Sequence, residues 1–458
     1  MNSSVPPAGA SIAARRPWNR LLRRLNPAAW LLLGLALREV LSFWTGQQYD
    51  FEVWIRNAYW VGPGVTPYQV FLPAPHLSFA YLTVALPSVG FLPLWTMILV
   101  GIYHGYLALP WSSRWLAYFL LKQPEVWGDV LLGYLLYRFV LRESGREDRA
   151  RGILAFWMLF PYPIIIAAMW GQFDSLVTAF WIAALLAEAA WVSGSLLGTS
   201  IFLKFLPLIA LPYHLVRDRG KGVVLVLVAC AIPILGTAAF FLAFHWSLPG
   251  FEGLVNAQVH GNSGGMTYAS LLESPYLSPY LEPTVFYTAF SYLWIPVVLG
   301  VGIWAARRFS VRNAEATVQA MLLILIAYML TRQDVYEQIV IYLLVFLLLD
   351  CVLWHPERRR HLAWVTGVAT VYLLVNQDLL LQLLGPLTPA ALTLADSANG
   401  SPVLGPLRNV GLIVLGLIFT AVLLWLAWEV ARSPRGRRGM ALRAEENGAA
   451  RRGPAPGS

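Results

Sequence analysis

Long apolar segments separated by short polar runs dominate the pattern along this chain. Each segment is long enough for a membrane-spanning helix, which needs about 20 apolar residues. We expect such helices at about residues 27–44, 122–141, 152–170, 175–191, 222–244, 285–306, 316–330, 339–354, 361–384 and 407–430. With the less regular segments 77–110 and 194–216, the pattern predicts an all-α membrane protein of about 11–13 transmembrane helices.

Arginine clusters between the apolar segments set the expected orientation. They occur at residues 15–24, 142–151, 217–221, 307–312, 358–360 and from 432 onward. Because basic clusters favour the cytoplasmic side, we expect both termini there. The chain then divides into a cytoplasmic tail (1–26), a polytopic transmembrane domain (27–430) and a disordered cytoplasmic tail (431–458). Loops 45–121 and 245–284 are expected on the outer side of a multi-pass cell membrane protein.

The outer loop 45–121 contains the apolar stretch 77–110, which must cross the membrane an even number of times to keep this topology. Pro87, Pro93 and Pro110 interrupt it, and it is short for two full spans. We therefore expect juxtamembrane or re-entrant helices on the outer face, with a tight hairpin of two crossings as the alternative.

Lys204 lies near the middle of the apolar segment 194–216, which is long enough for one helix. A single crossing would put the basic run at 217–221 on the wrong side, so we expect a broken hairpin, with Pro207 just beyond the break. Irregular backbone at membrane depth must be buried in protein or line a wet cavity. A lysine there costs about 2.5–3.5 kcal/mol and needs an anion. Asp174, Asp129 or a ligand phosphate are the candidates.

Composition supports the membrane assignment. Hydrophobic residues make up 58% of the chain and charged residues only 12%, about half the share usual in soluble proteins. The net charge of +9 does not indicate nucleic-acid binding, because the arginines cluster between apolar segments. The chain lacks a P-loop, a dinucleotide-binding fingerprint and a His/Cys metal spacing. No cofactor is therefore expected.

Two acidic clusters fall on the expected outer side. Asp50 and Glu52 follow the first helix, and Arg56, Tyr68 and His76 follow in the same loop. They could be a catalytic base with orienting groups, or simply solvated loop residues.

The second acidic cluster is Trp170 to Asp174, which precedes a helix that returns inward. Asp174 could cap that helix, and a helix start that faces outward also favours phosphate.

Three further polar groups are candidates for the site. Lys122 and Asp129 are seven residues apart and would share a helical face, which favours an internal ion-pair network. Arg332, Tyr336 and Glu337 belong to a polar outer break, which is either a short loop or a contact to a sugar or phosphate. His260 lies in a Gly-rich run that suits a loop ordering over a substrate.

These clusters resemble the ordered motifs of the GT-C membrane glycosyltransferases, in particular the glycosylphosphatidylinositol mannosyltransferases and their prokaryotic relatives. The matching blocks are Tyr49-Asp50-Phe51-Glu52-Val53-Trp54, Gly64-Val65-Thr66-Pro67-Tyr68, Lys122-Gln123-Pro124 with Asp129, Phe160 to Pro163 through Trp170 to Leu176, Leu203-Lys204-Phe205-Leu206-Pro207, and Val335-Tyr336-Glu337-Gln338. Except for the last, they fall in the first half of the chain.

The resemblance implies a GT-C-type bundle and an enzyme that transfers a hexose, with mannose expected, from a polyprenyl-phosphate carrier with inversion. Asp50 would be the general base, with Glu52, Arg56, Tyr68 and His76 orienting the acceptor. Lys204 and Arg332 would bind the donor phosphate. The pocket would be formed by Trp170, Gln172, Asp174, Lys122, Asp129, Tyr336, Glu337 and His260. Asp-Phe-Glu replaces the usual Asp-x-Asp of the mannosyltransferases, so no metal is assigned.

The implied partners are a polyprenyl-phosphate-linked sugar donor, a lipid or glycan acceptor, membrane lipids and, in one reading, an accessory subunit. Two other functions stay open at this point. The chain could be a transporter or flippase of lipid-linked sugars, although no internal repeat typical of many transporters is seen. It could also be a non-catalytic subunit of a glycosyltransferase complex.

Overall fold

The computed structural model describes residues 25–69, 71–72, 74, 91–111, 113–218, 220–248, 251–252, 255, 265–272, 291–309, 313–333 and 335–433. Regular structure within these ranges is helical, apart from isolated β-bridges between Gly62 and Val65 and between Gly265 and Val335. The expected all-α membrane fold is confirmed. The tails 1–24 and 434–458 lie outside the described residues, as do His76 and His260.

The N-terminal half contains α2 (Pro27–Trp44), α3 (Gln48–Trp60), α4 (Pro93–Leu107), α5 (Arg114–Leu121), α6 (Gln123–Ser144), α7 (Glu147–Leu159), α8 (Pro161–Ile164), η1 (Ile165–Trp170), α9 (Asp174–Leu186), α10 (Ala190–Leu203), η2 (Leu206–Ala210), α11 (Leu211–Asp218) and α12 (Gly220–Ala243). The C-terminal half contains η3 (Tyr268–Leu271), α16 (Trp294–Arg308), α17 (Ala314–Thr331), η4 (Glu337–Ile339), α18 (Val340–Leu353), η5 (Pro356–Arg358), α19 (Arg359–Asn376), η6 (Leu381–Leu384), α20 (Pro389–Asn399) and α21 (Leu404–Arg432).

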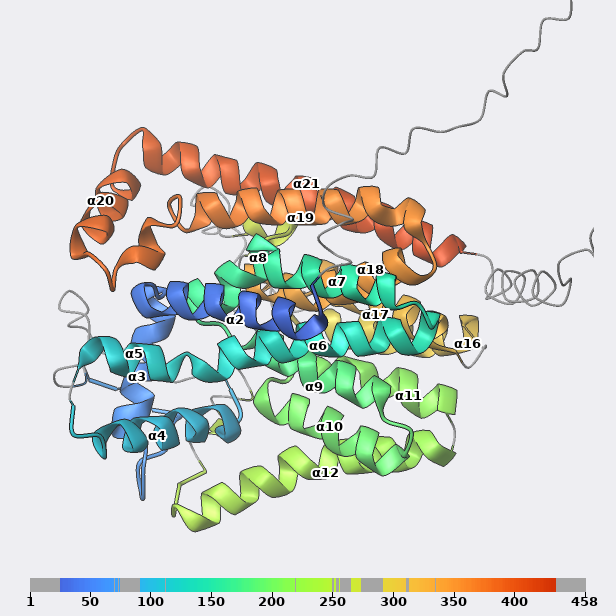
Figure 1. Cartoon of the computed structure of the whole chain (residues 1–458), viewed down its shortest axis with the longest axis horizontal. Helices are drawn as coiled ribbons and strands as arrows, with labels where there is room; N and C mark the ends of the chain where they lie inside the picture. Colours follow the sequence, from blue (N-terminus) through green and yellow to red (C-terminus); the bar gives the residue numbers. More distant parts are fainter. Residues whose placement is uncertain are drawn as a thin grey trace, which may run out of the picture.

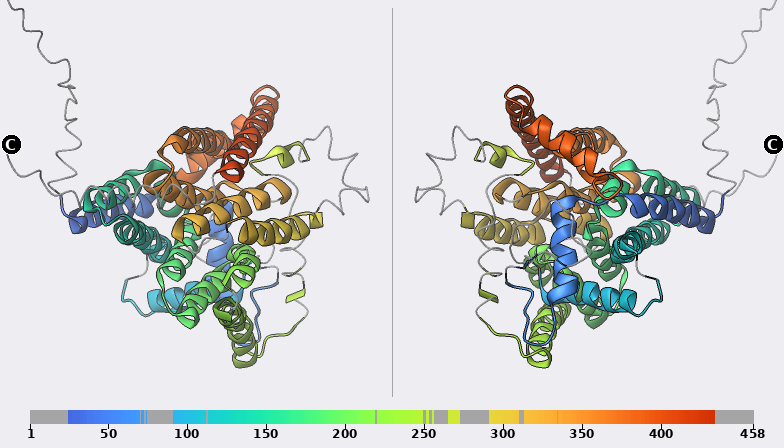
Figure 2. Two further views of the ribbon diagram at one scale, coloured as in Figure 1. Left: turned by 90° about the vertical axis from the view of Figure 1, so that its right-hand side faces the viewer. Right: turned by 90° about the vertical axis from the view of Figure 1, so that its left-hand side faces the viewer.

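The long helices lie side by side across the molecule, with α3, α4, α5 and α20 gathered at one end (Figure 1). Figure 2 shows α3 crossing that end of the bundle. Helix α18 is apolar except for Asp350 near its end and is buried from Val340 to Cys351, and α17 is buried over most of its length. A helix without a polar face must be enclosed by others, and α17 and α18 accordingly lie within the bundle.

Four described helices are long and apolar enough to cross a membrane: α2, α12, α17 and α21. The pair formed by α7 and the segment Pro161–Trp170, bent by 47°, would be a fifth. In the described part of the chain, the number of helices that are long and apolar enough to span a membrane is therefore smaller than the expected 11–13. The reason is that α9, α10, α16 and α18 have only 13 to 15 residues, and α6 carries several charged side chains.

Several expected helices are interrupted where proline or strained backbone requires it. The segment 152–170 is divided at Phe160, because Pro161 begins a new helix instead of continuing α7. The segment 361–384 ends its α-helix at Asn376, followed by positive φ angles at Asp378, Leu379 and Leu380. In the segment 45–121 the described residues form α3, α4 and α5, and α4, at 15 residues, is shorter than a full span. Residues 75–90, which include Pro87, lie outside the described residues.

The expected break around Lys204 is present. Helix α10 ends at Leu203, Lys204 has extended backbone (φ −152°, ψ 137°), and the 3₁₀ turn η2 leads into α11. Helix α10 packs between α9 and α12, and α11 packs against α12 and α16. The missing N–H of Pro207 favours this interruption.

Candidate active site

Asp50 lies in the first turn of α3, where two side chains from another part of the chain donate hydrogen bonds to it. Trp170 Nε1 lies 2.8 Å and Gln172 Nε2 2.6 Å from the same carboxylate oxygen, Oδ2. The other oxygen, Oδ1, has no hydrogen bond to any residue that the structure describes. Asp50 is partly exposed, so this second oxygen remains available to a ligand.

Gly171 makes this arrangement possible. Its φ of +91° ends η1 and turns the chain, so that the residues on either side of it both contact Asp50. A Cβ at this position would lie 3.0 Å from Cδ of Lys122, so a larger residue would be crowded as well as strained.

Lys204 forms an ion pair with Asp174, the first residue of α9. The Nζ–Oδ1 distance is 2.7 Å; the Asp174 side chain is fully buried and that of Lys204 is 14% exposed. The ammonium also lies 5.7 Å from the Phe91 ring centre and 5.4 Å from that of Phe173. Phe173, not Asp174, occupies the N-cap position of α9, so the capping interpretation of Asp174 is wrong. Its carboxylate is instead directed to Lys204.

The two groups are connected, because Gln172 and Asp174 belong to one short segment. Burial raises the pKa of Asp50; the hydrogen bonds from Trp170 and Gln172 and the charge of Lys204 oppose this rise, and the charge of Asp174 adds to it. A raised pKa makes a carboxylate a better proton acceptor. The site thus combines a basic carboxylate with a nearby fixed positive charge.

Glu337 adds a second acid to this region. Its Oε1 accepts a 2.6 Å hydrogen bond from Asn376, and its carbonyl oxygen accepts one of 2.8 Å from the Tyr162 hydroxyl. Burial is the main cause that raises its pKa to about 7, and the charge of Asp50 contributes. Asn376 is a residue that the sequence analysis missed, since it lies at the end of an apolar helix with no motif around it.

The other acidic residue of α3 has a different environment. Glu52 is fully buried and pairs with Arg56, with 2.8 Å between Oε1 and Nε, and Arg56 also donates to the carbonyl of Phe71. Tyr68 is buried, donates to the carbonyl of Phe91 and stacks near Phe241. Among the described residues, the side-chain hydrogen bonds of Asp50 come from Trp170 and Gln172 and not from these three side chains.

The expected internal ion-pair network is present in part: Asp129 belongs to a buried ion pair, but its partner is not Lys122. Lys122 occupies the N-cap position of α6, and its side chain makes no capping hydrogen bond. The buried Lys122 ammonium donates to the carbonyls of Thr45 and Ala168, and burial is the main cause that lowers its pKa to about 7. Asp129 instead pairs with Arg38 of α2 at 2.6 Å.

The polar break after α17 is held against a distant segment. Gly265 has a φ of +104°, and a Cβ there would lie 2.4 Å from the carbonyl oxygen of Val335. The next amide, that of Met266, donates to the same carbonyl at 2.7 Å. The Arg332 guanidinium lies 5.4 Å from the centre of the Trp294 ring. Tyr336 is the N-cap of η4, next to Glu337.

An apolar cavity of about 540 Å³ is lined by residues that include sequence neighbours of Lys204, although Lys204 itself is not among them. Its lining includes Phe205, the residue after Lys204, and Leu92, the residue after Phe91. Ile201 of α10 and Pro233 and Phe241 of α12 form further parts of the wall. These walls come from segments far apart in the chain, so the sequence alone could not identify them.

No cluster of three or more His, Cys, Asp or Glu side chains suited to a metal occurs in the ranges that the structure covers. Comparison with known proteins gives one family match: the family described as Glycosyltransferase family 87 matches residues 70–331, more than half of the 458-residue chain. A search of curated proteins found no match.

Proposed function

Because the chain belongs to glycosyltransferase family 87, a polytopic membrane glycosyltransferase family of the GT-C type, we propose that it takes a sugar from a polyprenyl-phosphate carrier and transfers it to an acceptor hydroxyl. The acceptor is a lipid or a glycan at the non-cytoplasmic face, and mannose is the first sugar to test. The observation that carries this proposal is the connection of Asp50 to Lys204 through the segment Trp170–Asp174. The residue after Lys204, Phe205, lines the apolar cavity.

In this proposal Asp50 is the general base. Its Oδ2 is held by Trp170 and Gln172, which leaves Oδ1 to accept the proton of the acceptor hydroxyl. Burial raises the pKa of Asp50, which improves a group that is otherwise a weak base. Two fixed donors on one oxygen also hold the carboxylate in one orientation, and positioning of this kind accounts for much of the effect of a catalytic group.

Lys204 is proposed to neutralise the carrier phosphate. An ammonium has three donors, and the structure shows one of them directed to Asp174. The others can reach a phosphate at the mouth of the apolar cavity, whose walls would hold the first isoprene units of the carrier. Fixed positive charge near a leaving phosphate stabilises the charge that develops in the transition state. Arg332 is a second candidate for this role.

The proposed reaction is a single displacement. The acceptor oxygen attacks the anomeric carbon while the bond from that carbon to the carrier phosphate oxygen breaks. The hydroxyl proton passes to Asp50, and the electron pair of the broken bond stays on the polyprenyl phosphate beside Lys204. Attack from the side opposite the leaving group inverts the anomeric configuration. The step needs no oxidant or reductant.

The decisive experiment uses the purified full chain in lipid nanodiscs, with polyprenyl-phosphate mannose and other polyprenyl-phosphate sugars as donors and a membrane lipid extract as acceptor. Release of polyprenyl phosphate and formation of a glycosylated product are measured together. We expect Asp50→Asn to lower the rate by at least about 100-fold, the usual contribution of a general base. Asp396→Asn, an exposed acid on α20, is the matched control and should keep the wild-type rate.

Three results would contradict the proposal. Full activity of Asp50→Asn with an unchanged unfolding temperature would remove Asp50 as the base. Counterflow uptake of lipid-linked sugar in proteoliposomes without product would favour a flippase. No turnover of any donor by the purified chain, restored by a second protein, would indicate a non-catalytic subunit.

A further inference from the structure

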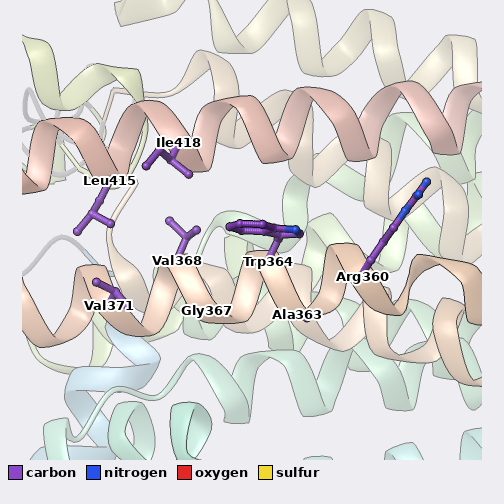
Figure 3. A pocket seen from close by; sticks show the side chains of 8 residues that line it. All are labelled: Arg360, Ala363, Trp364, Gly367, Val368, Val371, Leu415 and Ile418. Atoms are coloured by element: carbon purple, nitrogen blue, oxygen red, sulfur yellow. The ribbon is translucent and has the colours of Figure 1, made fainter.

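A second apolar groove, of about 570 Å³, lies between α19 and α21 (Figure 3). Trp364, Gly367, Val368 and Val371 of α19 line one side, and Leu415 and Ile418 of α21 line the other. Arg360 lies at one end of the groove, one helical turn before Trp364. The groove is not part of the candidate active site, and none of its residues belongs to the motifs described above.

The side chains that line the groove have the apolar character and the exposure expected of a surface that faces lipid. Helix α21 is long and apolar enough to span it, and the large apolar side chains along the groove are exposed: 54% for Trp364, 47% for Val371 and 40% for Ile418. From Arg360 to Val371 the helix rises about 16 Å, at 1.5 Å per residue. The hydrocarbon core of one leaflet is about 15 Å deep, half of the usual thickness. The groove therefore matches the length of acyl chain that lies within a single leaflet.

The end of the groove at which Arg360 lies carries positive charge. The Arg360 side chain is 56% exposed; it pairs with Glu429 and lies 4.9 Å from the centre of the Trp425 ring. Arg359 and Arg432 are also exposed at this end, at the start of α19 and the end of α21, so basic side chains outnumber the carboxylates of Glu357 and Glu429 there. A guanidinium has five N–H donors, so Arg360 can bind a phosphate while it keeps its contact with Glu429.

This end is remote from the candidate active site. Helix α19 begins at Arg359, and its last residue, Asn376, donates to Glu337. Arg360 therefore lies about 24 Å along the helix from that contact. Basic clusters favour the cytoplasmic side, and basic pockets between membrane helices on that side bind anionic lipid head groups.

We propose that this groove binds one anionic phospholipid of the cytoplasmic leaflet. An acyl chain lies between α19 and α21 against Trp364 and Val371, and the head-group phosphate contacts Arg360. The lipid would contact both helices and fill the space between them along the groove. The proposal does not depend on the sugar, donor or acceptor of the proposed reaction.

Gly367 provides a selective test. A Cβ at Gly367 would meet no atom within 4 Å, and Gly367 lines the groove, so the side chain of a leucine there would occupy groove space. Gly300 of α16 is the matched control, because it is also an exposed helical glycine with open space around it. Both changes replace a poor helix former with a good one to the same extent. Arg360→Gln removes the phosphate contact, and Arg307→Gln, in the last turn of α16, controls for the loss of one charge at an exposed basic helix end.

The experiment counts lipids bound to the detergent-purified full chain by native mass spectrometry, with phosphatidylglycerol or phosphatidylcholine added. We expect one phosphatidylglycerol to be retained in preference to phosphatidylcholine by the wild type and by both controls. Gly367→Leu should lower its occupancy at least 10-fold, and Arg360→Gln should abolish the preference for the anionic lipid. Equal binding of both lipids by the wild type, unchanged occupancy in Gly367→Leu or unchanged preference in Arg360→Gln would overturn the proposal. Unfolding temperatures measured without lipid verify that each variant is folded.

Discussion

The ion pair between Lys204 and Asp174 allows a structural role of the lysine to be separated from a catalytic one. We consider Lys204→Met, Asp174→Asn and the double variant. The two charged atoms are 2.7 Å apart, and Asp174 is fully buried whereas 14% of the Lys204 side chain is exposed. Each single change leaves one charge without its partner, and the double change removes both.

The expected effects on stability follow from burial. Lys204→Met leaves a buried carboxylate without its counter-charge, which costs about 3–5 kcal/mol. Asp174→Asn should cost less, because the remaining ammonium is partly exposed. The double variant should recover much of the loss, since replacing both members of a buried pair is often close to neutral. A coupling energy between the two changes of up to about 3 kcal/mol is therefore expected.

The expected effects on activity are different. If Lys204 stabilises the leaving phosphate, its removal should lower the rate about 100- to 1,000-fold, the loss measured when one donor to a developing oxyanion is removed. The double variant should be as slow as Lys204→Met, although its stability is restored. Unfolding temperature in nanodiscs and release of polyprenyl phosphate from a saturating donor are the two measurements.

One result would refute this reasoning. If the double variant regained both stability and rate, the positive charge of Lys204 would serve only to balance Asp174. The phosphate would then need another cation, and Arg332 would become the residue to test. Rates are compared only at temperatures at which all four proteins remain folded.

Three other predictions concern Asp50, the donor cavity and Lys122. Gln172→Ala removes a hydrogen bond that lowers the pKa of Asp50, so the acidic limb of kcat/KM against pH should move to higher pH. The control Gln123→Ala should not move it. If the limb does not move in Gln172→Ala, it does not report the titration of Asp50. Ala238→Phe places a larger side chain in the cavity wall, so it should raise KM about 10-fold for donors with long-chain carriers and little for donors with short-chain carriers. An equal change in KM for both would argue against an isoprenoid in the cavity. Lys122 has a pKa lowered to about 7 in the folded protein, below its value of about 10.5 when unfolded, so the unfolded state binds more protons between these values. Stability should then rise with pH above 7 by up to about 1.4 kcal/mol per unit, and denaturant titrations at pH 7, 8 and 9 should show this slope in the wild type but not in Lys122→Met.

The amino-acid sequence by itself determined which segments are apolar helices and where one of them must break. Apolar length and basic clusters are local properties, and proline acts on its own turn of helix. For this reason the interruption at Lys204 could be predicted, as could the need for an anion near it. The sequence left both Asp174 and Asp129 as candidates for that anion, and it predicted an internal ion-pair network around Lys122 and Asp129 without identifying Arg38 as the partner of Asp129.

Only the tertiary structure decided which groups meet. Asp50 and Gln172 are 122 residues apart, and Asp129 and Arg38 are 91 apart, so no local pattern could pair them. The turn at Gly171 directs Trp170 and Gln172 to one carboxylate oxygen, and the apolar cavity that Phe205 lines has walls from separate helices. Helices form from the chemistry of neighbouring residues, whereas ion pairs and cavities depend on how the helices pack, because a buried charge is stable only beside whichever partner packing brings to it.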